Sequence, residues 1–152
     1  GPPESAMRLC VSVAEAADDV GLERELVVAL AHEESHWRET AVSSAGACGV
    51  LQVLARYHCP DASTCDGCDL VRAGVGVYRR YLDRHDGDVA EALREYACGR
   101  RRGPACDHHA EKVLRRRDRV LSAMAPAPPS LSPASTPPAP AQWAWATSRR
   151  GG

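Results

Sequence analysis

The sequence contains no phenylalanine, and tryptophan and tyrosine together make up only 5% of its 152 residues. A hydrophobic core therefore has to be built mainly from leucine, valine and alanine. Lysine is nearly absent as well, because Lys112 is the only one and arginine carries the rest of the basic charge. The hydrophobic fraction is still 44% and apolar residues recur in periodic segments, which excludes a chain that is disordered throughout.

Long uncharged apolar runs are also missing, and none approaches the roughly 18 residues that a membrane span requires. The formal net charge is -1, so the chain as a whole has no positive field that would attract nucleic acid or anionic lipid. We therefore expect no membrane span and no nucleic-acid partner, and we expect a monomer.

Cysteine, by contrast, is abundant, with seven residues at positions 10, 48, 59, 65, 68, 98 and 106. In a reducing compartment such a set suggests metal or redox chemistry, whereas in an exported protein it suggests disulfides. The odd count leaves at least one thiol unpaired. The chain begins with glycine and shows no signal peptide, as expected if a leader has been removed. We expect an exported protein of the periplasm, the cell envelope or the extracellular space.

Proline divides the chain into two regions. Seven of the eleven prolines lie between Pro126 and Pro140. This composition favours extended polyproline II segments that bury no core, so we interpret residues 125–152 as a disordered linker or tail. Trp143 and Trp145 stand near its end. A single domain is expected over residues 4–124.

Within residues 4–124, apolar residues recur at helical spacing, and no segment alternates convincingly with the period of two that is typical of strands. One apolar stripe consists of Leu22, Leu26, Ala29, Leu30 and Trp37. We predict an all-α fold in which strands are confined to the loop at 38–48. The expected helices cover residues 5–19, 22–37, 50–56, 70–85, 89–97 and 108–124.

The most informative segment is LAHEESHWRETAVSSAGACGVLQVL, residues 30–54. It places Glu34-Ser35 at the end of a predicted helix, followed by Ala41-Val42-Ser43 and then by Gly46-Ala47, Gly49 and Gln52. At this fixed spacing the chain resembles the soluble lytic transglycosylase branch of the lysozyme-like superfamily. The resemblance implies a lysozyme-like helical domain whose partners are the glycan strands of peptidoglycan.

A second stretch, residues 73–99, resembles the same family. The matching residues are Gly74, Leu82, Ala92, Leu93, Tyr96 and Gly99. The sequence departs from the family at Leu70 and Ala97, where asparagine is common, and each departure removes a side-chain hydrogen bond that would brace the cleft. The resemblance covers roughly residues 20–120.

Glu34 has the properties expected of a general acid. Cleavage of a glycosidic bond requires a proton on the leaving oxygen while positive charge grows at the anomeric carbon. Glu34 lies at the edge of the apolar stripe and at the C-terminal end of its helix, where burial and the helix dipole would both favour the protonated form. Periodicity alone does not distinguish Glu34 from Glu33, and Glu39 on the following loop matches no family position.

The resemblance implies that Glu34 acts first as an acid and then as a base. The N-acetyl group of the substrate assists and its own C6 hydroxyl attacks, so that cleavage of the β-1,4 MurNAc–GlcNAc bond leaves a 1,6-anhydro-MurNAc end. The substrate-binding residues that the resemblance implies are Ser43, Gly49, Gln52 and Tyr96. No cofactor and no metal are needed. A hydrolytic muramidase on the same fold is the alternative, because water could replace the internal hydroxyl.

The same helix contains His32-Glu33-x-x-His36, which matches the HExxH pattern of zinc peptidases. Two histidines four residues apart share a helix face and could hold zinc while Glu33 activates the bound water. This alternative is less favoured, because His32 and His36 fall on the predicted solvent face. No third ligand stands at a typical spacing either, although Glu91 or Glu95 could serve.

His58 and the cysteines at 59, 65 and 68 could instead bind a structural zinc ion. A disulfide-stapled loop suits an exported enzyme better, so we favour disulfides. The expected pairs are Cys98 with Cys106 and Cys59 with either Cys65 or Cys68. Cys10 and Cys48 would then be available to tie the N-terminal helix to the Ser/Gly-rich loop.

Overall fold

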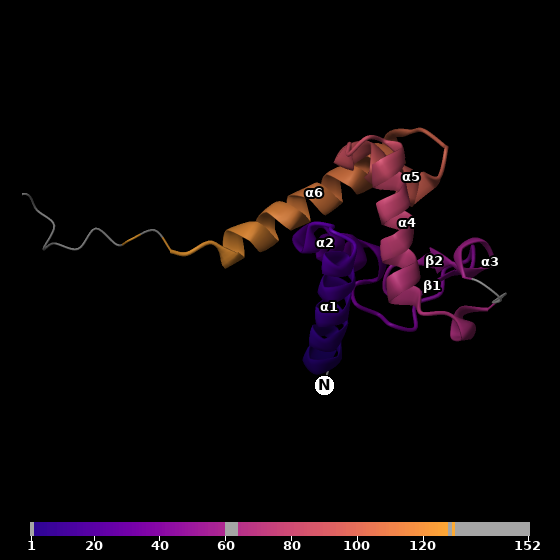
Figure 1. The fold of residues 1–152 in the computed structure, drawn as a ribbon, viewed down its shortest axis with the longest axis horizontal. Coiled ribbons are helices and arrows are strands. Elements are labelled where there is room, and N and C mark those ends of the chain that lie inside the picture. Colours follow the sequence, from indigo (N-terminus) through magenta and orange to yellow (C-terminus); the bar gives the residue numbers. More distant parts are fainter. Residues whose placement is uncertain (1, 60–63, 128, 130–152) are drawn as a thin grey trace, which may run out of the picture.

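The computed structural model describes residues 2–59, 64–127 and 129, and over these residues the fold is helical with one small sheet (Figure 1). The helices are α1 (Pro2–Asp19), α2 (Arg24–Ser35), α3 (Ala55–His58), α4 (Leu70–Arg84), α5 (Val89–Cys98) and α6 (Pro104–Met124). A 3-10 turn, η1 (Cys65–Gly67), precedes α4. Strands β1 (Ala47–Cys48) and β2 (Val53–Leu54) form an antiparallel hairpin. The predicted all-α class is therefore confirmed.

Helix α2 lies at the centre of the core, because it packs against α1 on one side and α6 on the other. Its Leu26, Ala29 and Leu30 are buried, as is Leu22 just before it, and Trp37 packs against the same cluster. The predicted apolar stripe is therefore the face that the helix buries. Tyr78 is the largest fully buried side chain, in the place that a phenylalanine often takes in other cores.

Helices α4 and α5 pack against each other and are joined by a turn at 85–88. Each begins at an aspartate whose carboxylate caps the helix: Asp69 accepts from the backbone N–H of Arg72 and Asp88 from that of Glu91, both at 3.1 Å. The Asp69 cap fixes the start of α4, and the Asp88 cap fixes the start of α5, which carries Glu95 and Tyr96.

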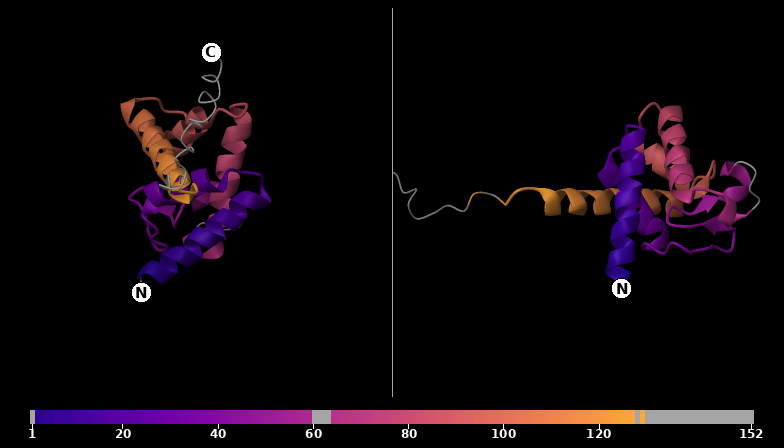
Figure 2. Two further views of the ribbon diagram at one scale, coloured as in Figure 1. Left: turned by 90° about the vertical axis from the view of Figure 1, so that its left-hand side faces the viewer. Right: turned by 60° about the horizontal axis from the view of Figure 1, so that its bottom comes forward.

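Helix α6 is longer than predicted, since it begins at Pro104 rather than near residue 108. Proline is favoured in the first turn, where its missing N–H removes no helical hydrogen bond. The first half of α6 packs on α2 and α5, and the second half projects from the body of the domain (Figures 1 and 2). The small sheet and α3 lie at the opposite end of the molecule (Figure 1).

The helix predicted over residues 50–56 is wrong. Residues 53–54 form β2 instead, and α3 begins only at Ala55. Gln52 has a left-handed backbone with φ 51°, which ends any helix that approaches it and turns the chain back onto β1. Strand β2 therefore also lies outside residues 38–48, the loop to which we expected strands to be confined.

Three disulfides staple the domain: Cys48–Cys65, Cys59–Cys68 and Cys98–Cys106. The predicted Cys98–Cys106 pair is confirmed, as is one of the two partners considered for Cys59. The link between Cys10 and Cys48 is wrong, because Cys48 is bonded to Cys65 and Cys10 on α1 has a free thiol. The zinc alternative is wrong as well, since its three cysteine sulfurs are all used in disulfides.

The predicted tail lies largely outside the described residues, which end with 125–127 and 129 after α6. Trp143 and Trp145 are among the residues beyond them. Among the helices that the structure describes, none is long and apolar enough to cross a membrane.

Candidate functional site

Glu34 is the last residue but one of α2, and its side chain is nearly buried, with 15% exposed. Its Oε1 lies 3.1 Å from Nε2 of His109, which reaches it from α6. This imidazole nitrogen is buried, and it forms no hydrogen bond of good geometry with any described residue. Glu34 is therefore enclosed on one side by the imidazole of His109.

The chain leaves α2 through a strained turn. His36 and Trp37 both have left-handed backbones, with φ of 52° and 63°. Such conformations in residues other than glycine are unfavourable, and they concentrate at functional sites. The buried Ser35 hydroxyl donates to the Ala31 carbonyl at 3.1 Å, and Arg38 Nε donates to the Ser35 carbonyl at 3.0 Å. These bonds hold the end of α2 and fix where Glu34 projects.

Glu33, the neighbour from which periodicity could not distinguish Glu34, has a different environment. Its side chain is 3% exposed, and its carboxylate accepts from Arg116 Nε at 2.6 Å and lies 3.2 Å from Lys112 Nζ. Burial by itself would raise the pKa of Glu33, but hydrogen bonds and charge from Arg116 and Lys112 outweigh it and hold this pKa below its ordinary value. Glu33 is thus kept ionised, which is unsuitable for a general acid.

In the loop after α2, residues 41–52, the two ends are hydrogen bonded to each other. The Ala41 carbonyl accepts from the backbone N–H of Gly49 at 2.8 Å and from Nε2 of Gln52 at 3.1 Å. Nε2 of Gln52 also donates to the Gly49 carbonyl at 2.9 Å. The motif is therefore one folded loop, in which the spacing between Ala41, Gly49 and Gln52 is set by direct contact.

Ser43 and Gly49 shape this loop from within. The Ser43 hydroxyl accepts from the Ala47 N–H at 3.0 Å and closes the turn that enters β1. Gly49 is buried with φ 77°, and a Cβ placed there would come within 2.8 Å of Leu70 Cδ1. The close neighbour that requires glycine at this position is therefore a side chain of the protein itself.

Gln52 and Tyr96 meet at a groove between the hairpin and the helices α4 and α5, which we call the Tyr96 groove. Its walls include Val53 and Leu54 of β2, Val77 and Tyr81 of α4, and Tyr96, Ala97 and Gly99 at the end of α5, with Arg101 at its rim. Gln52 lines the groove, and its side-chain nitrogen donates to two carbonyl groups of the loop, those of Ala41 and Gly49. Its Oε1 accepts from no residue that the structure describes, so this oxygen is available to a ligand.

Tyr96 lines the groove and supports the hairpin. Its hydroxyl donates to the Leu51 carbonyl at 2.6 Å and so braces the backbone that leads into Gln52. Its ring packs edge-on against Tyr78 and Tyr81. Burial, and then the negative charge of Glu34, raise the pKa of Tyr96 well above its ordinary value. The phenol therefore stays neutral and lies within the electrostatic reach of Glu34.

The HExxH residues do not form a metal centre among the residues that the structure describes. The His32 and His36 rings have centroids 4.9 Å apart, but no group of three histidine, cysteine, aspartate or glutamate side chains in the described ranges could hold a metal ion. Glu33, which would activate a bound water, is engaged by Arg116 and Lys112. His36 is exposed as predicted, whereas His32 is half-buried, and burial followed by the charge of Arg116 lowers its pKa.

Sequence reasoning missed two parts of this site. His109 was not considered beside Glu34, and Lys112 and Arg116 were not considered beside Glu33. All three belong to α6, 75 or more residues further along the chain, and only the packing of α6 on α2 brings them there. The sequence did offer one signal. His108 and His109 stand side by side in the helix expected over residues 108–124, and no role was assigned to them.

Comparison with known protein families identifies the family of the chain. The family model described as Transglycosylase SLT domain matches residues 12–107, from the middle of α1 to the first turn of α6. This range includes Glu34, the loop of residues 41–52 and Tyr96, and it ends just before His109. No solved structure gives a significant match to the chain.

Proposed function

The chain belongs to the Transglycosylase SLT domain family, which comprises lysozyme-like lytic transglycosylases of peptidoglycan, and we propose that it cleaves the β-1,4 bond between MurNAc and GlcNAc with Glu34 as its single catalytic carboxylate. The observation that carries this proposal is the contrast between two adjacent glutamates. Glu33 is held ionised by two cations, whereas Glu34 faces the imidazole of His109 and has no arginine or lysine partner among the described residues.

In the proposed reaction Glu34 donates its proton to the glycosidic oxygen while the bond from that oxygen to the anomeric carbon of MurNAc breaks. The carbonyl oxygen of the neighbouring N-acetyl group bonds to the anomeric carbon and stabilises its positive charge. The Glu34 carboxylate then takes the proton of the C6 hydroxyl, whose oxygen displaces the N-acetyl oxygen at the anomeric carbon. The product is a 1,6-anhydro ring, Glu34 is protonated again, and no water is consumed.

The environment of Glu34 supports this double role. A group that must both give and receive a proton needs a partner that stabilises either state without fixing one of them. The His109 imidazole can accept a hydrogen bond from a protonated carboxyl group or donate one to a carboxylate. An arginine at this position would fix the ionised state, as Arg116 does for Glu33.

We assign the Tyr96 groove to the glycan. The Tyr81 and Tyr96 rings offer apolar faces against which sugar rings can pack, and Oε1 of Gln52 can accept a hydrogen bond from a hydroxyl or amide of the substrate. Ser43 and Gly49, which the family resemblance implied as substrate-binding residues, act in this proposal by holding the loop that positions Gln52. A peptidoglycan substrate and three disulfides also support export from the cytoplasm.

Substitution of Glu34 tests the proposal. Glu34→Gln keeps the shape of the side chain and removes the transferable proton, so cleavage of purified peptidoglycan should fall by about 10²–10⁴-fold. Glu39→Gln is the matched control, because Glu39 is exposed on the following loop, and its activity should equal that of the unmodified chain. Full wall-cleaving activity in Glu34→Gln would refute the assignment.

A further inference from the structure

A second pocket lies beside the Tyr96 groove, where the segment joining α5 to α6 is closed by the Cys98–Cys106 disulfide. We call residues 99–105 the arginine loop, because Arg100, Arg101 and Arg102 follow one another within it. Gly99, Arg101 and Glu95 line both this pocket and the groove, so the two hollows are adjacent.

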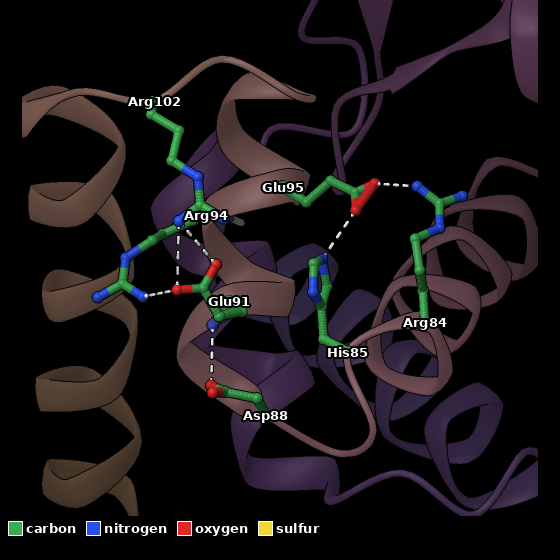
Figure 3. Close-up of polar contacts among 7 residues, drawn as sticks. All are labelled: Arg84, His85, Asp88, Glu91, Arg94, Glu95 and Arg102. Carbon is green, nitrogen blue, oxygen red and sulfur yellow. Dashed lines mark hydrogen bonds and ion pairs between the residues drawn. The ribbon is translucent and has the colours of Figure 1, made fainter.

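The carboxylates of this pocket are all engaged, and Figure 3 shows those of Glu91 and Glu95. Glu95 is nearly buried between Arg84 and His85, whose Nε2 lies 2.9 Å from it. Glu91 pairs with Arg94 at 2.7 Å and with Arg102 at 3.0 Å, and Arg94 also reaches Asp107 at 2.6 Å. These pairs use three arginines and leave no free carboxylate in the pocket.

Arg100 and Arg101 remain without a carboxylate partner among the residues that the structure describes. Both are exposed, and both line the pocket. The disulfide fixes the two ends of the loop, so the backbone keeps these two positive charges at the pocket. An anion bound between them would relieve their repulsion, and guanidinium groups suit a carboxylate because they can donate two parallel hydrogen bonds to it.

The proposed substrate has carboxylates close to its sugar rings. MurNAc carries a lactyl ether that ends either in a free carboxylate or in a short peptide with its own carboxylates. If the glycan lies in the Tyr96 groove, this substituent projects from the sugar toward the walls. We propose that Arg100 and Arg101 bind a carboxylate carried by the lactyl group of the substrate, an inference that rests on the proposed function. This contact makes the protein select muramyl glycans over neutral ones.

The test is equilibrium binding by calorimetry to three oligosaccharides of equal length. The first contains only N-acetylglucosamine and is neutral, the second contains MurNAc with free lactyl carboxylates, and the third carries the peptide. Titrations use the full chain with Glu34→Gln to preserve the ligands, and mass spectrometry afterwards checks that they are intact. Cleavage in this background would refute the role of Glu34, and the comparison would then use the reduced, non-cleavable forms of the same three oligosaccharides.

We expect Arg100→Gln with Arg101→Gln to weaken binding of at least one carboxylate-bearing ligand by about tenfold, because charge-assisted hydrogen bonds are lost. Binding of the neutral ligand should stay within about twofold. A loss for the second ligand identifies the lactyl carboxylate, and a loss for the third alone identifies the peptide. The preference should also weaken as salt rises, because the two arginines are exposed.

Arg115→Gln with Arg119→Gln is the matched control, since it removes the same charge from two exposed arginines of α6 that have no ion pair with any described residue. Three results would overturn the anion site: equal weakening for all three ligands, no weakening for any of them, or the same weakening in the control. A carboxylate preference that depends on Arg100 and Arg101, in a chain that cleaves no peptidoglycan, would refute the proposed function and leave the anion site standing.

Discussion

At the scale of single residues, the site depends on how two adjacent glutamates are surrounded. The sequence identified Glu34 through its spacing from the loop of residues 41–52, and it left Glu33 as a competitor because both flank the same apolar stripe. Arg116, which distinguishes them, lies 83 residues from Glu33 along the chain. No local pattern could place that charge, because it reaches Glu33 only through the packing of α6 on α2.

The environment of Glu33 predicts a pH-dependent contribution to stability. Its pKa is below the ordinary value of 4.5 in the folded protein, so its contribution is fully present above that value and is lost as the pH falls through the folded pKa. Glu33→Gln should lower the free energy of unfolding at neutral pH by about 2 kcal/mol. It should also lose less stability than the unmodified chain on acidification, as measured by denaturant unfolding between about pH 6 and about pH 3.

Glu39→Gln is the control for this comparison, because its exposed carboxylate should leave the acid profile unchanged. Glu33→Gln should retain most of its wall-cleaving activity per folded molecule. An acid profile identical to that of the unmodified chain, or a loss of activity as large as that of Glu34→Gln, would contradict the separate roles assigned to the two glutamates.

At the scale of helices and strands, the sequence predicted most of the helices. The apolar stripe of α2, the helices α4 and α5, and the existence of α6 all follow from helical periodicity. The segment around Gln52 was misread as a helix. Its left-handed backbone is imposed by hydrogen bonds to Ala41 and Gly49 and by Tyr96 holding the Leu51 carbonyl, which are contacts that no periodicity reveals.

Helix α4 packs closely on this loop at Gly74. A Cβ on Gly74 would come within 2.6 Å of Leu51 Cβ and 3.1 Å of Val53 Cγ2, both buried. Gly74→Ala should therefore force α4 away from the hairpin and lower the free energy of unfolding by about 1–3 kcal/mol, as measured by denaturant unfolding. Activity should fall too, because Leu51 precedes Gln52.

Gly76 on the same helix provides the control. A Cβ there would meet only Arg80 Nη1, at 3.8 Å. Gly76→Ala should raise the free energy of unfolding by about 0.5–1 kcal/mol, because alanine loses less conformational entropy in a helix than glycine does. Equal effects of the two substitutions would show that the contact at Gly74 does not limit how α4 packs.

At the scale of the whole molecule, the disulfides tie the irregular part of the chain to the helices. Cys48–Cys65 and Cys59–Cys68 connect the hairpin and α3 to the segment before α4, and Cys98–Cys106 joins α5 to α6. Cys98–Cys106 could be predicted from sequence proximity, which left the partner of Cys59 open between Cys65 and Cys68. Cys48–Cys65 could not, because it depends on how the hairpin folds toward η1.

Thiol counting tests this arrangement. Protein made in an oxidising compartment and denatured without reductant should show one free thiol per chain, that of Cys10, and seven after reduction. Reduction should also lower the melting temperature, because each disulfide restricts the unfolded chain. Seven free thiols before reduction would contradict the disulfides, and stoichiometric zinc in that material would favour the metal site instead.

The central claim, that this domain cleaves peptidoglycan by internal attack with Glu34 as acid and base, is tested most directly by the chemistry of the new ends. Purified glycan strands would be digested in isotopically labelled water and the fragments weighed by mass spectrometry. We predict ends that are one water lighter than reducing ends and contain no solvent oxygen, formed by the unmodified chain and by Glu39→Gln but not by Glu34→Gln. Reducing ends that carry the labelled oxygen would show that water is the nucleophile and would contradict the account.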